Sequence, residues 1–174
     1  MNNIIIRAAQ LSDVDDLIRL NNKYLLNHLT EEQKQKGFVR VEYEREYLQQ
    51  IITNKEIVVA LDYDLVIGYY LIGRTSNNDR LVYQREKLLL IFNDEKKIEK
   101  IGYGAQAVIE KEYRGNNLLQ LMLNELIKQL NGKYEILFSS VTKINNSALK
   151  AHTAGGYKVL AEDDDKFYVG LKLF

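Results

Sequence analysis

The residues with the clearest chemical potential form a short turn, Arg114-Gly115-Asn116-Asn117, between an apolar run (104–109) and a second apolar run at helical spacing. The first backbone N–H groups of a helix have no acceptor inside the helix, and the helix dipole is positive at that end. A strand that turns directly into a helix therefore presents donors that can hold an anion. The turn predicts an anion site, although the same pattern also fits an ordinary connection without a ligand.

Hydrophobic patterning supplies the elements that must position this turn. We expect five strand regions (3–9, a hairpin around Asp62-Tyr63-Asp64 within 56–73, 100–109, 134–141 and a final hairpin over 157–174). Helices are expected after a Ser12 cap, after a Thr30 cap, and over 42–52, 116–130 and 145–154. Residues 74–80 predict a loop, and 81–92 fit either a helix or part of an insertion. This order predicts an α/β fold, a central, mostly antiparallel mixed sheet with helices on both faces.

Composition limits the classes of protein to consider. The chain has 174 residues, is 46% hydrophobic and shows no linker-like segment, so we expect one domain over 1–174. Its formal net charge of zero argues against nucleic-acid binding. No apolar run reaches the length of a membrane span, and no signal peptide is evident, so a cytoplasmic protein is expected. Without cysteine and with two distant histidines, no metal site is expected.

Residues 107–119, AVIEKEYRGNNLL, resemble the strand and helix that hold the CoA pyrophosphate in the GNAT superfamily of N-acetyltransferases. Those enzymes move an acetyl group from acetyl-CoA to an amine, and the resemblance covers nearly the whole chain. Two glycines of the family turn are replaced by Asn117 and Leu119, but the backbone donors remain, and asparagine tolerates a positive φ. The spacing of Leu119 from Met122 and Leu123 places it in the buried stripe. The resemblance implies ten cofactor-binding residues: Ala107, Val108, Ile109, Arg114, Gly115, Asn116, Asn117, Leu118, Leu119 and Asn145.

Residues 141–159, VTKINNSALKAHTAGGYKV, are similar to a second segment of the same family, in which an Asn-x-x-Ala pattern opens a helix. Asn145 and Ala148 match that pattern. Many members carry a tyrosine between it and the closing Gly-Tyr, and this tyrosine protonates the departing thiolate. His152 holds the matching position, which implies a general acid, because imidazolium is acidic enough near neutral pH. The alternative is that His152 only packs on the helix face of Ala148.

The resemblance also implies how the reaction would run. Pantetheine would pair with the exposed edge of the strand over 104–109, and a backbone N–H near Val108 or Ile109 would polarise the thioester carbonyl. The attacking amine must lose a proton. The candidate bases, none with a sequence signature, are Glu110, Tyr103, Glu42 and Glu46.

The leading hypothesis is therefore acetyl transfer from acetyl-CoA, as co-substrate, to a primary amine by direct attack in a ternary complex. The acceptor would be a small molecule or a peptide, with no nucleic acid, membrane or metal involved, and the chain would be a monomer or homodimer. We expect acceptor specificity to reside in 21–55 and 74–98. Two alternatives remain open: a weak or inactive CoA-binding sensor domain, and an acyltransferase that uses another acyl donor.

Overall fold

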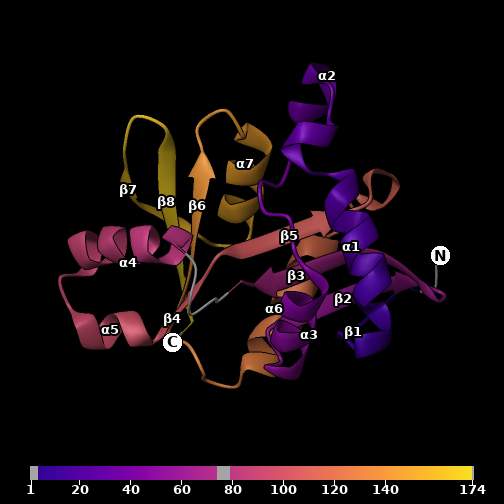
Figure 1. Ribbon diagram of the computed structural model, residues 1–174, viewed down its shortest axis with the longest axis horizontal. Helices are drawn as coiled ribbons and strands as arrows, with labels where there is room; N and C mark the ends of the chain where they lie inside the picture. The colour runs from indigo at the N-terminus through magenta and orange to yellow at the C-terminus, as the bar shows by residue number, and fades with distance from the viewer. Residues whose placement is uncertain (1–3, 74–78, 174) are drawn as a thin grey trace.

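The computed structural model describes residues 4–73 and 79–173, and its strands form two four-stranded sheets within those ranges (Figure 1). The first sheet has the order β1-β2-β3-β5, from Ile4–Ala8, Ile57–Asp62, Leu65–Ile72 and Ala105–Ile109. The second has the order β4-β6-β8-β7, from Ile101–Tyr103, Ile136–Thr142, Lys166–Lys172 and Lys158–Glu162. Neighbouring strands are antiparallel except β4 and β6, so the predicted mixed, mostly antiparallel architecture is confirmed.

The expected single strand over 100–109 is wrong, because the chain changes sheets at Gly104. Residues 101–103 pair with β6, and residues 105–109 pair with β3. Gly104 has a φ of +68°, and a Cβ there would lie 3.2 Å from the Gly73 carbonyl oxygen. Glycine permits both the left-handed backbone and the close approach. As a result β5 ends the first sheet, and its outer edge has no strand partner in the described chain.

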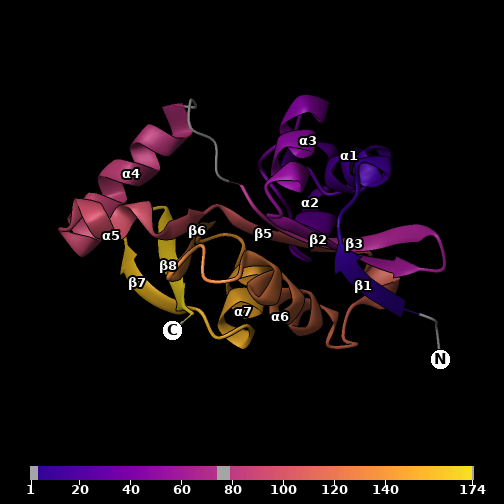
Figure 2. The same ribbon diagram turned by 90° about the horizontal axis from the view of Figure 1, so that it is seen from below.

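Helices cover both faces of the first sheet, as expected (Figure 2). On one face lie α1 (Val14–Lys23), α2 (Glu31–Lys34) and α3 (Arg45–Thr53), with a 3₁₀ turn at Leu26–His28. On the opposite face lie α6 (Leu118–Leu130) and α7 (Asn146–Ala154). The segment that the sequence left open is helical: α4 (Asp79–Phe92) and α5 (Glu95–Glu99) lie against the second sheet.

The buried apolar side chains of the described residues form three clusters. One joins α1 and α3 to the first sheet through residues such as Leu17, Leu20 and Ile51. The second buries the α6 stripe, including Met122 and Leu126, against the opposite face. The third packs α4 and α5 on β6 and β8. Burial of these apolar stripes fixes where the β5–α6 turn and α7 lie relative to the sheet.

Helix starts only partly follow the predicted caps. Thr30 caps α2 and forms a capping box with Gln33, as expected. Ser12 is not a cap, because it lies inside a 3₁₀ turn at Leu11–Asp13. There the Asp13 carboxylate accepts hydrogen bonds from the Gln10 N–H and from Arg7, which fixes the turn instead. The helix expected from residue 42 begins at Arg45, and the loop expected over 74–80 lies largely outside the described residues.

Within the described ranges, none of the helices combines the length and the apolar character that crossing a bilayer requires.

Candidate active site

The turn that precedes α6 has the conformation that its residue types predict. Gly115 has a φ of +84° and Asn117 a φ of +59°. Helix α6 then begins at Leu118, and its first backbone bond runs from the Leu121 N–H to the Asn117 carbonyl. The Asn117 side chain caps none of the described N–H groups. The N–H groups of the first turn of α6 are therefore free to meet an anion.

A pocket of about 540 Å³, which we name the Arg114 pocket, opens beside this turn. Its size suits a small-molecule ligand. Eight of the ten predicted cofactor-binding residues line it: Ala107, Val108, Ile109, Arg114, Gly115, Asn117, Leu118 and Leu119. Asn116 is not among them; its side-chain amide donates to the Tyr113 carbonyl. Asn145 lines a different pocket, described below.

Leu119 departs from its predicted place. It is half-buried, packs at the edge of the α6 core and forms part of the pocket wall, whereas Leu118 is buried. Leu118, and not Leu119, is therefore the first residue of α6 that faces the core. A ligand in the Arg114 pocket would meet an apolar side chain where the family turn has a small residue.

Arg114 is already engaged by the protein. Its Nε donates to the Ile109 carbonyl at 3.0 Å, and its Nη1 donates to the Lys36 carbonyl at 2.8 Å. The guanidinium carbon lies 5.1 Å from the centre of the Tyr24 ring. Tyr24 and Lys36 also line the pocket, and the sequence analysis missed both. Both residues lie about 80 to 90 positions before the β5–α6 turn in the sequence. No local sequence pattern could therefore connect them with the turn.

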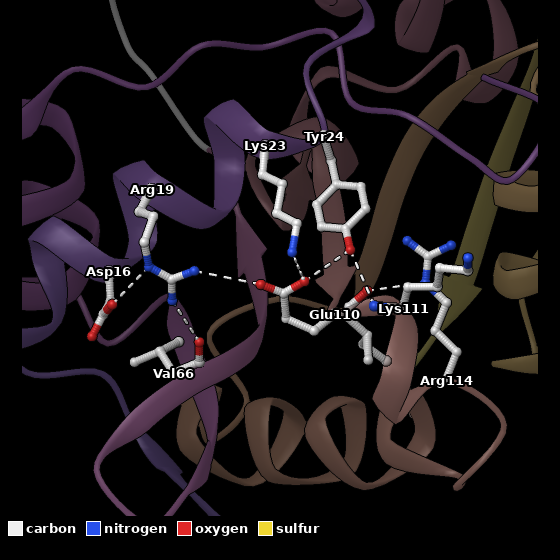
Figure 3. Close-up of polar contacts among 9 residues, drawn as sticks. Asp16, Arg19, Lys23, Tyr24, Val66, Glu110, Lys111 and Arg114 are labelled. Carbon is white, nitrogen blue, oxygen red and sulfur yellow. Dashed lines mark hydrogen bonds and ion pairs between the residues drawn. The ribbon is translucent and has the colours of Figure 1, made fainter. Parts of the chain in front are cut away.

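Glu110, at the end of β5, is the centre of the charged cluster in Figure 3. Its carboxylate accepts hydrogen bonds from Lys23 at 2.6 Å, Tyr24 at 3.0 Å and Arg19 at 3.4 Å. Burial raises the pKa of Glu110, but the hydrogen bonds from Lys23 and Tyr24 and the Lys23 charge outweigh it, so the pKa lies below 4.5. A carboxylate held in this way is a poor proton acceptor at neutral pH. Of the candidate bases, Glu110 is therefore poorly suited to take a proton, and its contacts join α1 to the end of β5.

A second pocket, of about 520 Å³, lies beside the earlier residues of β5, and we name it the Tyr43 pocket. Its wall includes residues 38–44, Tyr47 and Gln106, together with Ser139 to Thr142 from β6. Among the described lining residues, those from the two segments expected to set specificity all belong to 21–55. The two pockets share five wall residues and therefore adjoin: Phe38, Val39, Ala107, Ala148 and His152.

Residues 36–39 cross the place where the pockets meet, and side chains from two elements hold them there. The Asn145 amide donates to the Phe38 carbonyl at 3.0 Å, and its carbonyl accepts the Ala148 N–H as the cap of α7. Ser147 and Arg114 both donate to the Lys36 carbonyl. Asn145 thus has a structural task that occupies both ends of its side chain.

The remaining candidate bases have different surroundings. Tyr103 is buried, and its hydroxyl donates to the Ile98 carbonyl at 3.2 Å. Glu42 is exposed and lines the Tyr43 pocket. Of the four candidates, Glu42 is the one that the described pocket walls include.

His152, on α7, lies at the junction of the two pockets, but its protonation differs from the expectation. Nδ1 lies 2.8 Å from the Ala148 carbonyl oxygen. A carbonyl only accepts, so Nδ1 carries a proton. Burial lowers the pKa of His152 below 6.5, although the carbonyls of Ala148 and Ala105 favour the protonated ring. At neutral pH the ring is therefore uncharged with a bare Nε2, and it is not the ready imidazolium acid that the sequence predicted.

The backbone of β5 presents alternate residues to the junction. The Glu110 N–H donates to the Ile67 carbonyl and the Gly73 N–H to the Gly104 carbonyl, so even-numbered residues direct their backbone groups toward β3. The groups of Ala107 and Ile109 point the other way, toward the outer edge. An N–H for a ligand carbonyl would thus come from Ala107 or Ile109, and the expectation for Val108 is wrong.

Comparison with solved structures identifies this arrangement. The chain resembles the PaiA N-acetyltransferase of Thermoplasma acidophilum in complex with coenzyme A, with a TM-score of 0.66 and 17% identity. It also resembles a GNAT-family acetyltransferase of Streptococcus pneumoniae, with a TM-score of 0.65 and 18% identity. Each match covers 98% of this chain and 99% of the other chain. YncA of Salmonella typhimurium with its cofactor acetyl-CoA matches 99% of this chain and 95% of its own (0.65, 13%). The chain has the GNAT fold. No protein-family model and no curated protein matches the sequence.

Within the GNAT fold, the part of the chain that the structure describes contains no group of three or more His, Asp or Glu side chains arranged to hold a metal ion.

Proposed function

We propose that this chain transfers the acetyl group of acetyl-CoA to a primary amine by direct attack in a ternary complex. The observation that carries the proposal is the pair of adjoining pockets, which meet at Ala107 and His152. In this proposal, the start of α6 in one pocket would hold the anion, and the other pocket would receive the second substrate. The solved structures of the same fold that contain acetyl-CoA or CoA support the assignment of the first ligand.

The Arg114 pocket offers the groups that acetyl-CoA needs. Its diphosphate would lie over residues 114–119, where the N–H groups of the first turn of α6 and Arg114 supply positive potential. Pantetheine carries amides along an extended chain and would pair with the outer edge of β5. The thioester carbonyl would then accept from the Ala107 N–H, which stabilises the negative charge that develops on its oxygen.

The Tyr43 pocket would hold the amine. It combines carboxylates of Glu42 and Glu44 with polar side chains from β6 and the stacked rings of Tyr43 and Tyr47, whose centres are 5.4 Å apart. A neutral amine nitrogen at the junction would attack the thioester carbon and form a C–N bond. Collapse of the tetrahedral intermediate would break the C–S bond and release CoA and the N-acetylated product.

The test combines binding and turnover. Titration calorimetry and thermal unfolding with acetyl-CoA, CoA and longer acyl-CoAs would identify the donor, since a ligand at 100 times its Kd adds about 2.7 kcal/mol of stability. Release of free thiol with a panel of small amines, amino acids and peptides would then identify the acceptor. We expect acetyl-CoA binding and amine-dependent thiol release. Binding without transfer to any amine would favour the sensor domain, preference for a longer acyl-CoA would favour another donor, and no binding would overturn the proposal.

A further inference from the structure

Of the two ring nitrogens of His152, one has a hydrogen-bond partner among the described residues and the other has none. Nδ1 donates its proton to the Ala148 carbonyl, one helical turn back along α7. Nε2 is buried and has no hydrogen-bond partner among the described residues. Leaving a buried acceptor unpaired costs free energy, so such an atom stands out from the polar groups that the fold satisfies. A proton donor that arrives with a substrate would supply the missing partner.

The surroundings of the ring favour its neutral form. Tyr157 contacts it edge to face, with ring centres 4.9 Å apart, and the Tyr157 hydroxyl is itself paired with Tyr70. No described carboxylate forms an ion pair with the ring. The charged side chains that share its two pockets are Arg40, Glu42, Glu44 and Lys166 in the Tyr43 pocket, and Lys36 and Arg114 in the Arg114 pocket. The Ala148 and Ala105 carbonyls favour the protonated ring, but burial outweighs them and lowers the pKa of His152, so a proton taken up by Nε2 is readily passed on.

The position of the ring is as informative as its protonation. His152 and Ala107 belong to the walls of both pockets, so they flank the place where the two substrates would meet. A group there lies between the nitrogen that must lose a proton and the sulfur that must gain one. Glu110, the acid at the end of β5, is held in ion pairs with α1.

We propose that His152 performs both proton transfers of the reaction, first as base and then as acid. Resting on the proposed acetyl transfer, Nε2 takes the proton from the amine nitrogen as the C–N bond forms. It then gives that proton to the CoA sulfur as the C–S bond breaks. The imidazole ends neutral as it began, and the products are the amide and the CoA thiol.

The first test needs no turnover. The chain has two histidines, so proton and nitrogen NMR resolve both rings. His28 is exposed, and a His28→Gln variant assigns the two sets of resonances. We expect His152 to titrate below the ordinary histidine pKa of about 6.5, and its neutral form to carry the proton on Nδ1. A His152 that titrates at or above that value, or that carries the proton on Nε2, overturns the shuttle whether or not the chain is an acetyltransferase.

The second test uses turnover with acetyl-CoA and a weakly basic arylamine, which is itself neutral across the pH range studied. His152→Ala should lower kcat by about 10²- to 10⁴-fold while the acetyl-CoA Kd changes little. Added imidazole should restore part of the rate, and His28→Ala should behave like the wild type. The wild-type kcat should fall on the acid side, with an apparent pKa below 6.5, and this limb should vanish in His152→Gln.

Three results have distinct meanings. An unchanged kcat in His152→Ala, with normal melting temperature, overturns the shuttle and leaves acetyl transfer intact. A rate that falls only on the alkaline side assigns His152 as an acid from the start and also overturns it. Acetyl-CoA binding without transfer by the wild-type chain overturns the proposed function, and the shuttle with it.

Discussion

At Arg114, the guanidinium donors are divided between two backbone carbonyls, those of Ile109 and Lys36, and the group lies over the Tyr24 ring. These contacts fix the Arg114 guanidinium in the pocket wall before a ligand binds, which reduces the conformational entropy lost on binding. A diphosphate would compete for the same donors. Phosphate oxygens carry negative charge and therefore form stronger hydrogen bonds with guanidinium than neutral carbonyls do.

Arg114→Ala should weaken acetyl-CoA binding by about tenfold to a hundredfold. Pantetheine, which lacks the diphosphate, should keep its affinity within about twofold, because only the diphosphate meets the lost charge. Titration calorimetry with both ligands measures the difference. Arg114→Lys is the control: it keeps the charge, loses the planar fork and should fall between the other two proteins. An equal loss for both ligands would place the diphosphate elsewhere.

At the scale of elements, the Glu110 cluster connects α1 to the end of β5. Lys23 ends α1 and Tyr24 follows it directly, and the Tyr24 hydroxyl also accepts the Lys111 N–H (Figure 3). The chain between β5 and α6 therefore leaves the sheet at a fixed point. The position of this point determines the direction in which the first N–H groups of α6 point.

Glu110→Gln should reduce the free energy of unfolding at neutral pH by about 1 to 2 kcal/mol, because the Lys23 and Arg19 partners are partly exposed and screened. The folded-state pKa of Glu110 lies below 4.5, so its contribution is present above that pH and is lost as the pH falls through the lowered pKa. Urea unfolding from pH 7 to pH 3 should show the two proteins converging at the acid end. Glu112→Gln, at an exposed neighbouring position, should match the wild type. A gap that stays constant with pH would mean that the charge is not responsible.

The sequence predicted most elements because their apolar periods and caps are local. The α6 stripe, the Thr30 cap and the Asn145 cap are each decided by residues within a few positions. The break at Gly104 could not be predicted, because it depends on the approach of Gly73 from another strand. The same limit applies to the site. The positive φ of Gly115 and Asn117 can be predicted from the residues of the turn itself. The 36–39 segment and Tyr24 are distant in sequence and come next to the turn only when the chain folds.

For the whole molecule, the transfer of the chain from one sheet to the other at Gly104 creates the space for both pockets. At their near end, β5 and β6 are joined by the Ser139 hydroxyl, which donates to the Ala105 carbonyl at 3.0 Å. Beyond this point β5 continues along β3, while β6 continues along β8. The open outer edge of β5 therefore borders both pockets, and the 36–39 segment lies across their junction.

This division predicts that donor and acceptor binding can be changed separately. Glu42 lines the Tyr43 pocket and not the described wall of the Arg114 pocket. Glu42→Gln should raise KM for a cationic amine by roughly twofold to fivefold, the worth of an exposed charge pair, and leave the acetyl-CoA Kd unchanged. Arg114→Ala should raise the acetyl-CoA Kd and leave KM for the amine unchanged. In the double variant the two free-energy changes should add, because the side chains share no hydrogen-bond partner in the described structure. Steady-state kinetics with calorimetry on the four proteins measures both constants. Weaker acetyl-CoA binding in Glu42→Gln would show that the two pockets form one site.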